Sequence, residues 1–203
     1  MKRVLVTMLG LALVTGASVA VGQTGETTRI RGTIEKVDGN TLGVKTRDGR
    51  SITLKLDDNY SASAVVKASL SDIKPNSFVG AAASPLPDGS LRALEVHIFS
   101  EAQRGTGEGS RDYDLEPKST MTNGAVAGSV ESNDGRTLTI TYKGGEKKVL
   151  VTPNTPVVSF APATKDDLKP GAGIVVQAAS KIGDGEFKAS RFNIGRNGVN
   201  PPM

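Results

Sequence analysis

The phrases "LSDIKPNSFVG" (residues 70–80) and "KDDLKPGAGIV" (residues 165–175) place an acid, an aliphatic residue, Lys-Pro and a turn residue in the same order. Comparison outward from them aligns Gly32 with Gly128, and one single-residue adjustment brings the two Lys-Pro dipeptides into register. A match of this length in one register predicts an internal duplication. The two copies are residues 29–99 and 125–195.

Each copy has the pattern of a small β-barrel. In the first copy, alternating or continuously apolar segments are separated by Asp-Gly, Pro and Asn turns. The segments are "IRGTIEKV" (30–37), "TLGVKTR" (41–47), "RSITLKL" (50–56), "SFVGAAAS" (77–84) and "SLRALEVHIF" (90–99). Closing such strands into a barrel removes their exposed edges.

A short helix is expected between the third and fourth strands of each copy. Ser69 is a suitable N-cap, and Pro75 ends the helix. After the Pro of each phrase, Asn76 or Gly171 tolerates the positive φ that a tight turn requires. This element order matches an OB-type barrel. The sequence therefore predicts an all-β protein of two tandem OB-like barrels, each with a short helix.

The first residues have the features of a secretory signal. Lys2 and Arg3 precede an uncharged run that extends to Gly22 and ends in small residues, as signal peptidase requires. We expect a signal peptide over residues 1–20, with cleavage after Ala20 or after Gly22, and therefore a periplasmic location. An uncleaved single-span anchor is the alternative. No later run is long and apolar enough to span a bilayer.

Composition narrows the possible functions. The 203 residues include no Cys, which excludes disulfides and thiolate metal sites. The formal net charge is +4, and charges of both signs are interspersed without the basic block typical of nucleic-acid binding. We therefore expect no nucleic-acid partner and no cofactor.

Several phrases, taken as a set, resemble a family of exported bacterial proteins with a tandem OB-like domain of unknown function, often labelled metal ABC transporter permeases. They include "RGTIEKVDG" (31–39), "VVKASLSDIKP" (65–75), "PVVSFAP" (156–162) and "GVNPPM" (198–203). The resemblance implies the fold and export. It does not imply a permease, which needs several membrane spans. Where relatives carry a His and a Trp, this chain has Ser110 and Tyr113.

The single histidine, His97, lies in "LEVHIF". There Leu94, Val96 and Ile98 are expected to point inward, which places Glu95 and His97 together on the opposite face. One His and one carboxylate fall short of the ligand sets of zinc and copper sites. We therefore expect no metal site, and a His97 at the surface or at an interface. No Ser lies in a nucleophile-elbow sequence, so we predict no catalytic residue.

The connector, residues 100–124, is longer than the connections usual in compact domains. Its first half is rich in Gly, whereas its second half offers apolar anchors among carboxylates. We hypothesise that the second half packs across the barrels and forms part of a partner-binding surface; a plain tether is the alternative. The candidate binding residues are Arg104, Asp112, Tyr113, Asp114, Leu115, Met121, Glu95 and His97. Residues 196–203 form a C-terminal tail.

The expected function is a non-catalytic binding or scaffolding module of the cell envelope. Its partner would be an unknown envelope protein or periplasmic ligand. The alternatives are a carboxylate-dependent hydrolase acting on an envelope polymer and an accessory protein of a metal transport system. Because OB barrels host many functions, the site has to decide: a deep cleft with converging carboxylates favours an enzyme, and a shallow groove favours binding.

Overall fold

A computed structural model of the protein describes residues 27–201, which form twelve strands and three single turns of 3₁₀ helix. The strands are β1 (Thr27–Asp38), β2 (Thr41–Thr46), β3 (Ser51–Lys67), β4 (Phe78–Pro85), β5 (Leu91–Ile98), β6 (Gly109–Asp112), β7 (Thr120–Ser132), β8 (Gly135–Tyr142), β9 (Gly145–Val151), β10 (Val157–Pro162), β11 (Gly173–Gly183) and β12 (Glu186–Gly195). The 3₁₀ turns are η1 (Leu70–Asp72), η2 (Glu101–Gln103) and η3 (Lys165–Asp167). The predicted all-β class is confirmed. The predicted signal peptide lies outside the described residues.

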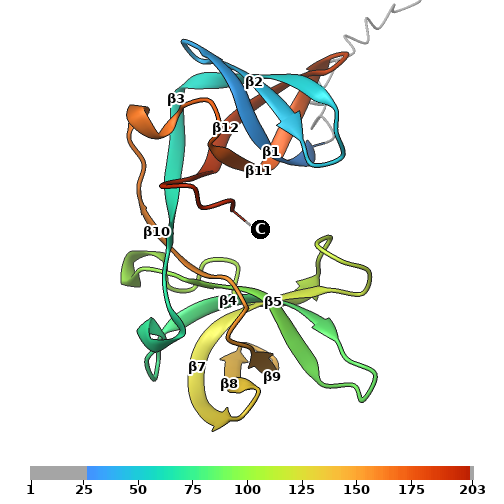
Figure 1. The fold of residues 1–203 in the computed structure, drawn as a ribbon, viewed down its shortest axis with the longest axis vertical. Coiled ribbons are helices and arrows are strands. Elements are labelled where there is room, and N and C mark those ends of the chain that lie inside the picture. The colour runs from blue at the N-terminus through green and yellow to red at the C-terminus, as the bar shows by residue number, and fades with distance from the viewer. Residues whose placement is uncertain (1–26, 202–203) are drawn as a thin grey trace, which may run out of the picture.

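Strand pairing closes the chain into two five-stranded barrels (Figure 1). In the first barrel the order is β1-β2-β3-β12-β11, and the ring closes because β11 pairs antiparallel with β1 and β12 pairs parallel with β3. In the second the order is β7-β8-β9-β5-β4, closed in the same way by the pairs β4–β7 and β5–β9. Closure leaves the barrel strands without free edges.

Neither copy of the duplication closes a barrel by itself. The first barrel combines β1, β2 and β3 of the first copy with β11 and β12 of the second, and the second barrel combines β7, β8 and β9 with β4 and β5. The predicted ranges 29–99 and 125–195 therefore delimit the copies in sequence, whereas each barrel contains strands of both. The exchange arises because β3 is 17 residues long and extends beyond the first barrel before the chain turns.

The two segments that cross between the barrels pair with each other. β3 and β10 run antiparallel, with Val65 opposite Phe160. Phe160 is also the equivalent of Val65 in the second copy, at the 95-residue offset that relates the two Lys-Pro dipeptides. The pairing is therefore symmetric about this contact. The molecule has the arrangement of a strand-exchanged dimer within one chain.

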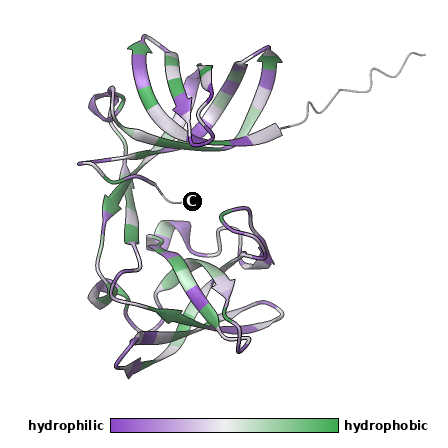
Figure 2. Cartoon of the chain, turned by 45° about the vertical axis from the view of Figure 1, so that its right-hand side comes forward, coloured by the Kyte–Doolittle hydropathy of each residue, from purple (hydrophilic) through white to green (hydrophobic). Residues whose placement is uncertain are grey.

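Each barrel encloses its own apolar core. The core of the first includes Leu54 and Ile174, and that of the second includes Val79 and Leu138, all with no exposed side-chain surface. Hydrophobic and hydrophilic residues alternate along the barrel strands (Figure 2). This alternation is the period-two pattern expected for strands with one face in a core.

The first hairpin of the second copy is longer than the duplication predicts. Ile34 pairs with Val44, but Ile140, the equivalent of Val44, pairs with Val126. Val130, which the sequence comparison aligns with buried Ile34, is 69% exposed. The hairpin β7–β8 continues beyond Val130 for two further residue pairs at its tip.

The longer hairpin also changes which glycine of the second copy is equivalent to Gly32. A Cβ at Gly32 would lie 2.4 Å from the carbonyl oxygen of Lys45, and one at Gly124 would lie 2.2 Å from that of Thr141. No atom lies within 4 Å of a Cβ placed at Gly128. Gly124, and not Gly128, is the structural equivalent of Gly32.

The predicted short helices are wrong, because each is only a single 3₁₀ turn. At η1 the Asp72 carboxylate accepts hydrogen bonds from the backbone N–H and the hydroxyl of Ser69, which fixes the turn. The residue before a proline is disfavoured in the α region, so the approach to Pro75 leaves no room for another turn. The predicted positive φ is confirmed, at 64° for Asn76 and 86° for Gly171.

Candidate functional site

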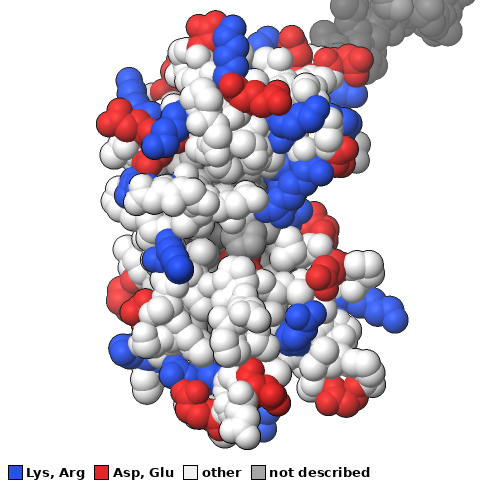
Figure 3. All heavy atoms as spheres, in the orientation of Figure 1, with Lys and Arg blue, Asp and Glu red and all other residues white. Residues whose placement is uncertain are grey.

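A cleft of about 510 Å³ lies between the barrels and is lined by residues of both. The first barrel contributes side chains from β3 and β12, and the second contributes side chains from β5 and β7, with further walls from β10 and the connector. Figure 3 shows charges of both signs over the two halves of the molecule, with basic side chains gathered at the right-hand edge of the waist.

The floor of the cleft is a row of residues on three neighbouring strands. On β4, Gly80 pairs with His97 of β5 on one side and with Asn123 of β7 on the other. A Cβ at Gly80 would lie 2.1 Å from His97 Nε2 and 2.6 Å from Asn123 Oδ1. The absent side chain therefore gives both polar groups the space that they occupy.

A hydrogen bond with the buried carboxyl group of Glu95 orients the ring of His97. Its Nδ1 lies 3.0 Å from Glu95 Oε1, and the two side chains are 3% and 0% exposed. In the tautomer with its proton on Nδ1, the ring donates this hydrogen bond to Glu95, and Nε2 is then its accepting nitrogen. The ring edges also contact Phe99 and Phe160, at centroid distances of 4.7 and 5.6 Å.

The expectation for His97 is partly corrected. Glu95 and His97 do share a face of β5, and that face meets the other barrel. It is buried, however, so the surface alternative is wrong. Leu94 does not point into the barrel core, because a register shift opposite Ala82 and Ala83 changes the phase of β5. Leu94 packs instead in a small cluster outside the two cores.

Asn123 is the second buried polar group of the floor. Its Nδ2 donates to the carbonyl oxygen of Thr106 at 3.0 Å. Its Oδ1 is buried and has no hydrogen-bond partner among residues 27–201. Burying such an acceptor without a partner is unfavourable by about 1–3 kcal/mol, so this atom is suited to a donor supplied by a ligand.

The charged groups that line the cleft are basic. Arg29, Arg111 and Arg191 contribute to its wall, and none of its described lining residues is acidic. Arg111 donates to the carbonyl oxygen of Gly107 at 2.9 Å. Arg191 has neither a hydrogen bond nor an ion pair with another described side chain. The cleft therefore presents positive charge to a ligand.

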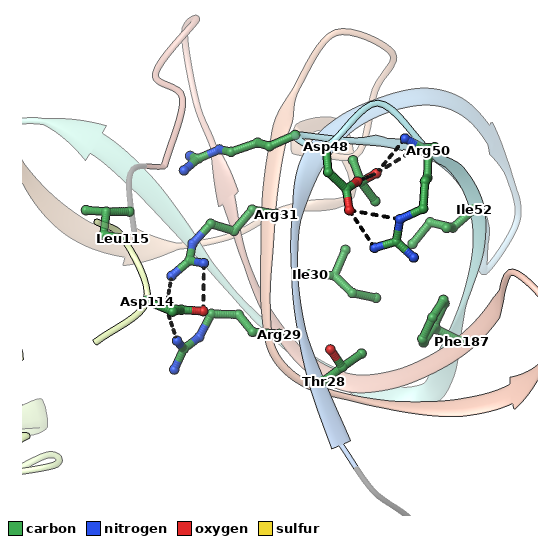
Figure 4. A pocket seen from close by; sticks show the side chains of 12 residues that line it. Thr28, Arg29, Ile30, Arg31, Asp48, Arg50, Ile52, Asp114, Leu115 and Phe187 are labelled. Atoms are coloured by element: carbon green, nitrogen blue, oxygen red, sulfur yellow. Dashed lines mark hydrogen bonds and ion pairs between the residues drawn. The ribbon is translucent and has the colours of Figure 1, made fainter. Parts of the chain in front are cut away.

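The second half of the connector packs on the first barrel. Its Tyr113 ring lies under two guanidinium groups, 4.6 Å from Arg29 and 5.5 Å from Arg31. The next residue, Asp114, accepts hydrogen bonds from the same two arginines (Figure 4), including one of 2.8 Å from Arg31. Hydrogen bonding from Arg31 lowers the pKa of Asp114 to about 2. This arrangement agrees with the predicted packing across the barrels.

The other predicted connector residues divide into two groups. Leu115 and Met121 join Tyr113 in the cluster that also contains Leu94, and Met121 lines the cleft. Asp112 is exposed at the end of β6, and Arg104 binds Glu101 and the carbonyl oxygen of Asn76. Neither of these last two reaches the cleft. The structure thus brings together Tyr113, Met121 and His97 of the candidate set.

A second hollow, of about 320 Å³, opens at the mouth of the first barrel (Figure 4). Arg50 forms an ion pair with Asp48 there, and its hydrogen bond lowers the pKa of Asp48 to about 2. Arg47 donates to the carbonyl oxygen of Pro201 at 2.5 Å. Burial lowers the pKa of Arg47, and the Glu95 charge opposes that shift from the second barrel. These contacts fix the β2–β3 hairpin and attach Pro201, in the segment that follows β12, to it.

The site residues that the sequence did not indicate are Gly80, Phe99, Arg111, Asn123, Phe160 and Arg191. Asn123-Gly124 has the composition of a turn, yet both residues lie within β7. Among residues 27–201, no group of three or more His, Asp or Glu side chains is placed to hold a metal ion. The arrangement offers a buried acceptor without a partner among residues 27–201, Asn123 Oδ1, and positive charge that attracts an anion.

Comparison with known proteins gives no further assignment: no family model, no curated protein and no solved structure matches the chain. Over residues 27–201, no helix has the length and apolar character needed to cross a membrane.

Proposed function

We propose that the protein is a non-catalytic binding module of the bacterial cell envelope that holds a ligand in the cleft between its two barrels. The observation that carries the proposal is the buried Asn123 Oδ1, which has no hydrogen-bond partner among residues 27–201 and lies beside the ring of His97 in a cleft of about 510 Å³. Cavities of this size with a few placed polar groups are typical of ligand sites. The signal-like residues 1–20 support export to the periplasm.

We further propose that both barrels are OB-like. Three strands form a meander, the fourth pairs with the first, and the fifth closes the ring parallel to the third. That is the order of a five-stranded OB barrel. Here the fourth and fifth strands of each barrel come from the other copy, so strands of both copies line each side of the cleft.

The nature of the lining favours binding over hydrolysis of an envelope polymer. A carboxylate-dependent hydrolase needs two carboxyl groups that reach the substrate. None of the described residues that line the cleft is acidic, and Glu95, which contacts His97 of the floor, is fully buried. One histidine with one buried carboxylate also falls short of a transport-type metal site.

The proposal is tested by ligand capture with a blocked cleft. Ser61 lines the cleft and is exposed, so Ser61→Trp fills the cleft without disturbing a core. Ser51→Trp, at an exposed position of the same strand and away from the cleft, is the matched control. We expect the mature protein and the control to retain one small molecule from a periplasmic extract, detected by mass spectrometry, and Ser61→Trp to lose it. Equal retention by all three proteins would refute binding in the cleft.

A further inference from the structure

We infer that the ligand of the cleft is an organic anion built on a flat ring and carrying an O–H or N–H donor. The inference rests on the proposed function, since it names the chemical class that the same cleft would take. Three independent features of the lining support it: the sign of its charges, its aromatic wall, and the hydrogen-bonding character of its floor.

The charges favour an anion. Arg111 and Arg191 line the cleft, and neither has a carboxylate partner among residues 27–201. The guanidinium group pairs with carboxylate or phosphate through two parallel hydrogen bonds. Arg29 also lines the cleft, but its guanidinium is already bound to Asp114 and Gln177. We therefore assign the anionic end of the ligand to Arg111 and Arg191.

The wall favours a flat apolar body. Phe99 and Phe160 are partly exposed, line the cleft, and lie 5.7 Å apart with an angle of 34° between their planes. The His97 ring meets both of them edge to face. Aromatic groups gain from offset or edge-to-face contacts with other rings. A ring of the ligand would extend this aromatic cluster into the cleft.

The floor favours a donor. Asn123 Oδ1 accepts no hydrogen bond from the described residues. In the tautomer that donates from Nδ1 to Glu95, Nε2 of His97 is a second acceptor beside it. A hydroxyl or amine of the ligand satisfies these acceptors, whereas a ligand without a donor leaves Asn123 Oδ1 unsatisfied. The required donor distinguishes the proposed class from simple aromatic acids.

The experiment uses four small probes, each tested against the mature protein by calorimetry. 4-Hydroxybenzoate carries the ring, the charge and the donor; benzoate lacks the donor, 4-hydroxybenzyl alcohol lacks the charge, and lactate lacks the ring. We expect 4-hydroxybenzoate to bind most tightly. Loss of the donor should weaken binding about fivefold and loss of the charge about tenfold, as for one neutral and one charged hydrogen bond. Lactate should bind most weakly.

Three variants connect each preference to its residues. In Arg111→Gln/Arg191→Gln, the preference for 4-hydroxybenzoate over the alcohol should disappear. In Asn123→Leu, the preference for 4-hydroxybenzoate over benzoate should disappear. Arg92→Gln removes an exposed charge on β5 outside the cleft and should keep both preferences. Thermal unfolding checks that each variant is folded.

The outcomes separate this inference from the proposed function. If the alcohol bound the mature protein as tightly as 4-hydroxybenzoate, or if none of the probes bound, the anionic ring class would be wrong. Capture of an extract molecule that Ser61→Trp abolishes would still support a binding module. If Ser61→Trp bound 4-hydroxybenzoate as the wild type does, the probe would lie elsewhere and the inference would be overturned.

Discussion

Gly80 lies directly opposite His97 across β4 and β5, so close that a Cβ on Gly80 would lie 2.1 Å from the imidazole Nε2. The histidine cannot simply move away, because Glu95 holds its other nitrogen and Phe99 and Phe160 flank the ring. The glycine thus determines where the histidine lies. The floor of the cleft depends on a residue that has no side chain.

Gly80→Ala is therefore expected to damage both the fold and the site. Overpacking of this kind lowers the free energy of unfolding by about 1–3 kcal/mol, and displacement of His97 and Asn123 should abolish ligand capture. Urea unfolding and the extract assay measure the two effects. Gly43→Ala is the control, since its Cβ would meet only ordinary contacts, the nearest at 3.4 Å. If both variants were equally stable and retained ligand equally, the proposed role of Gly80 would be wrong.

Cleavage of the connector should not separate the barrels. A protease site inserted at Gly105, where the chain is exposed, would cut the protein into two fragments that each contribute strands to both barrels. We expect the fragments to coelute in native size-exclusion chromatography and to separate only in denaturant. Two barrels of successive sequence would instead separate after the cut, and that result would exclude strand exchange.

The connector contact should respond to acid in a defined direction. The folded-state pKa of Asp114, about 2, lies below the ordinary value near 4. Its contribution to stability is therefore complete above pH 4 and is lost as the pH falls from 4 to 2. Since Asp114 is about half exposed, Asp114→Asn should lower the free energy of unfolding by less than about 1 kcal/mol at pH 7.

Urea unfolding at pH 7, 4 and 2 measures this difference between wild type and Asp114→Asn. The difference should shrink towards pH 2. A difference that stayed constant, or increased on acidification, would contradict the proposed ion pairs with Arg29 and Arg31. Asp112→Asn, at an exposed position two residues away without an ion pair among the described residues, should show no such trend.

The elements of the fold were predictable, but the partners of the strands were not. Alternation of apolar and polar residues is set by neighbours along the chain, so the strands around Leu42, Leu54 and Val79 follow from sequence. The exchange does not, because β4 and β5 have the same pattern as their copies β11 and β12. Either pair could close either barrel. The length of β3 decides between them through a crossing that local patterns do not specify.

The site was predictable only where its residues are apolar anchors. Tyr113 and Met121 pack against apolar or aromatic neighbours, as expected for apolar anchors of the connector. His97 was expected at a surface or an interface because β5 was assumed to have one buried face, whereas contact between the barrels buries both. Asn123 was missed because Asn-Gly is typical of a turn, and here it lies inside a strand.

The most direct test of ligand binding between the barrels uses the one histidine of the chain. Its imidazole Hε1 gives a single resonance in a ¹H–¹³C spectrum, so no assignment is needed. On addition of 4-hydroxybenzoate, this resonance should shift in the wild type and in Ser51→Trp, with the same saturation curve as calorimetry, and should not move in Ser61→Trp. Calorimetric binding that left the His97 resonance of the wild type unchanged would contradict the proposed site.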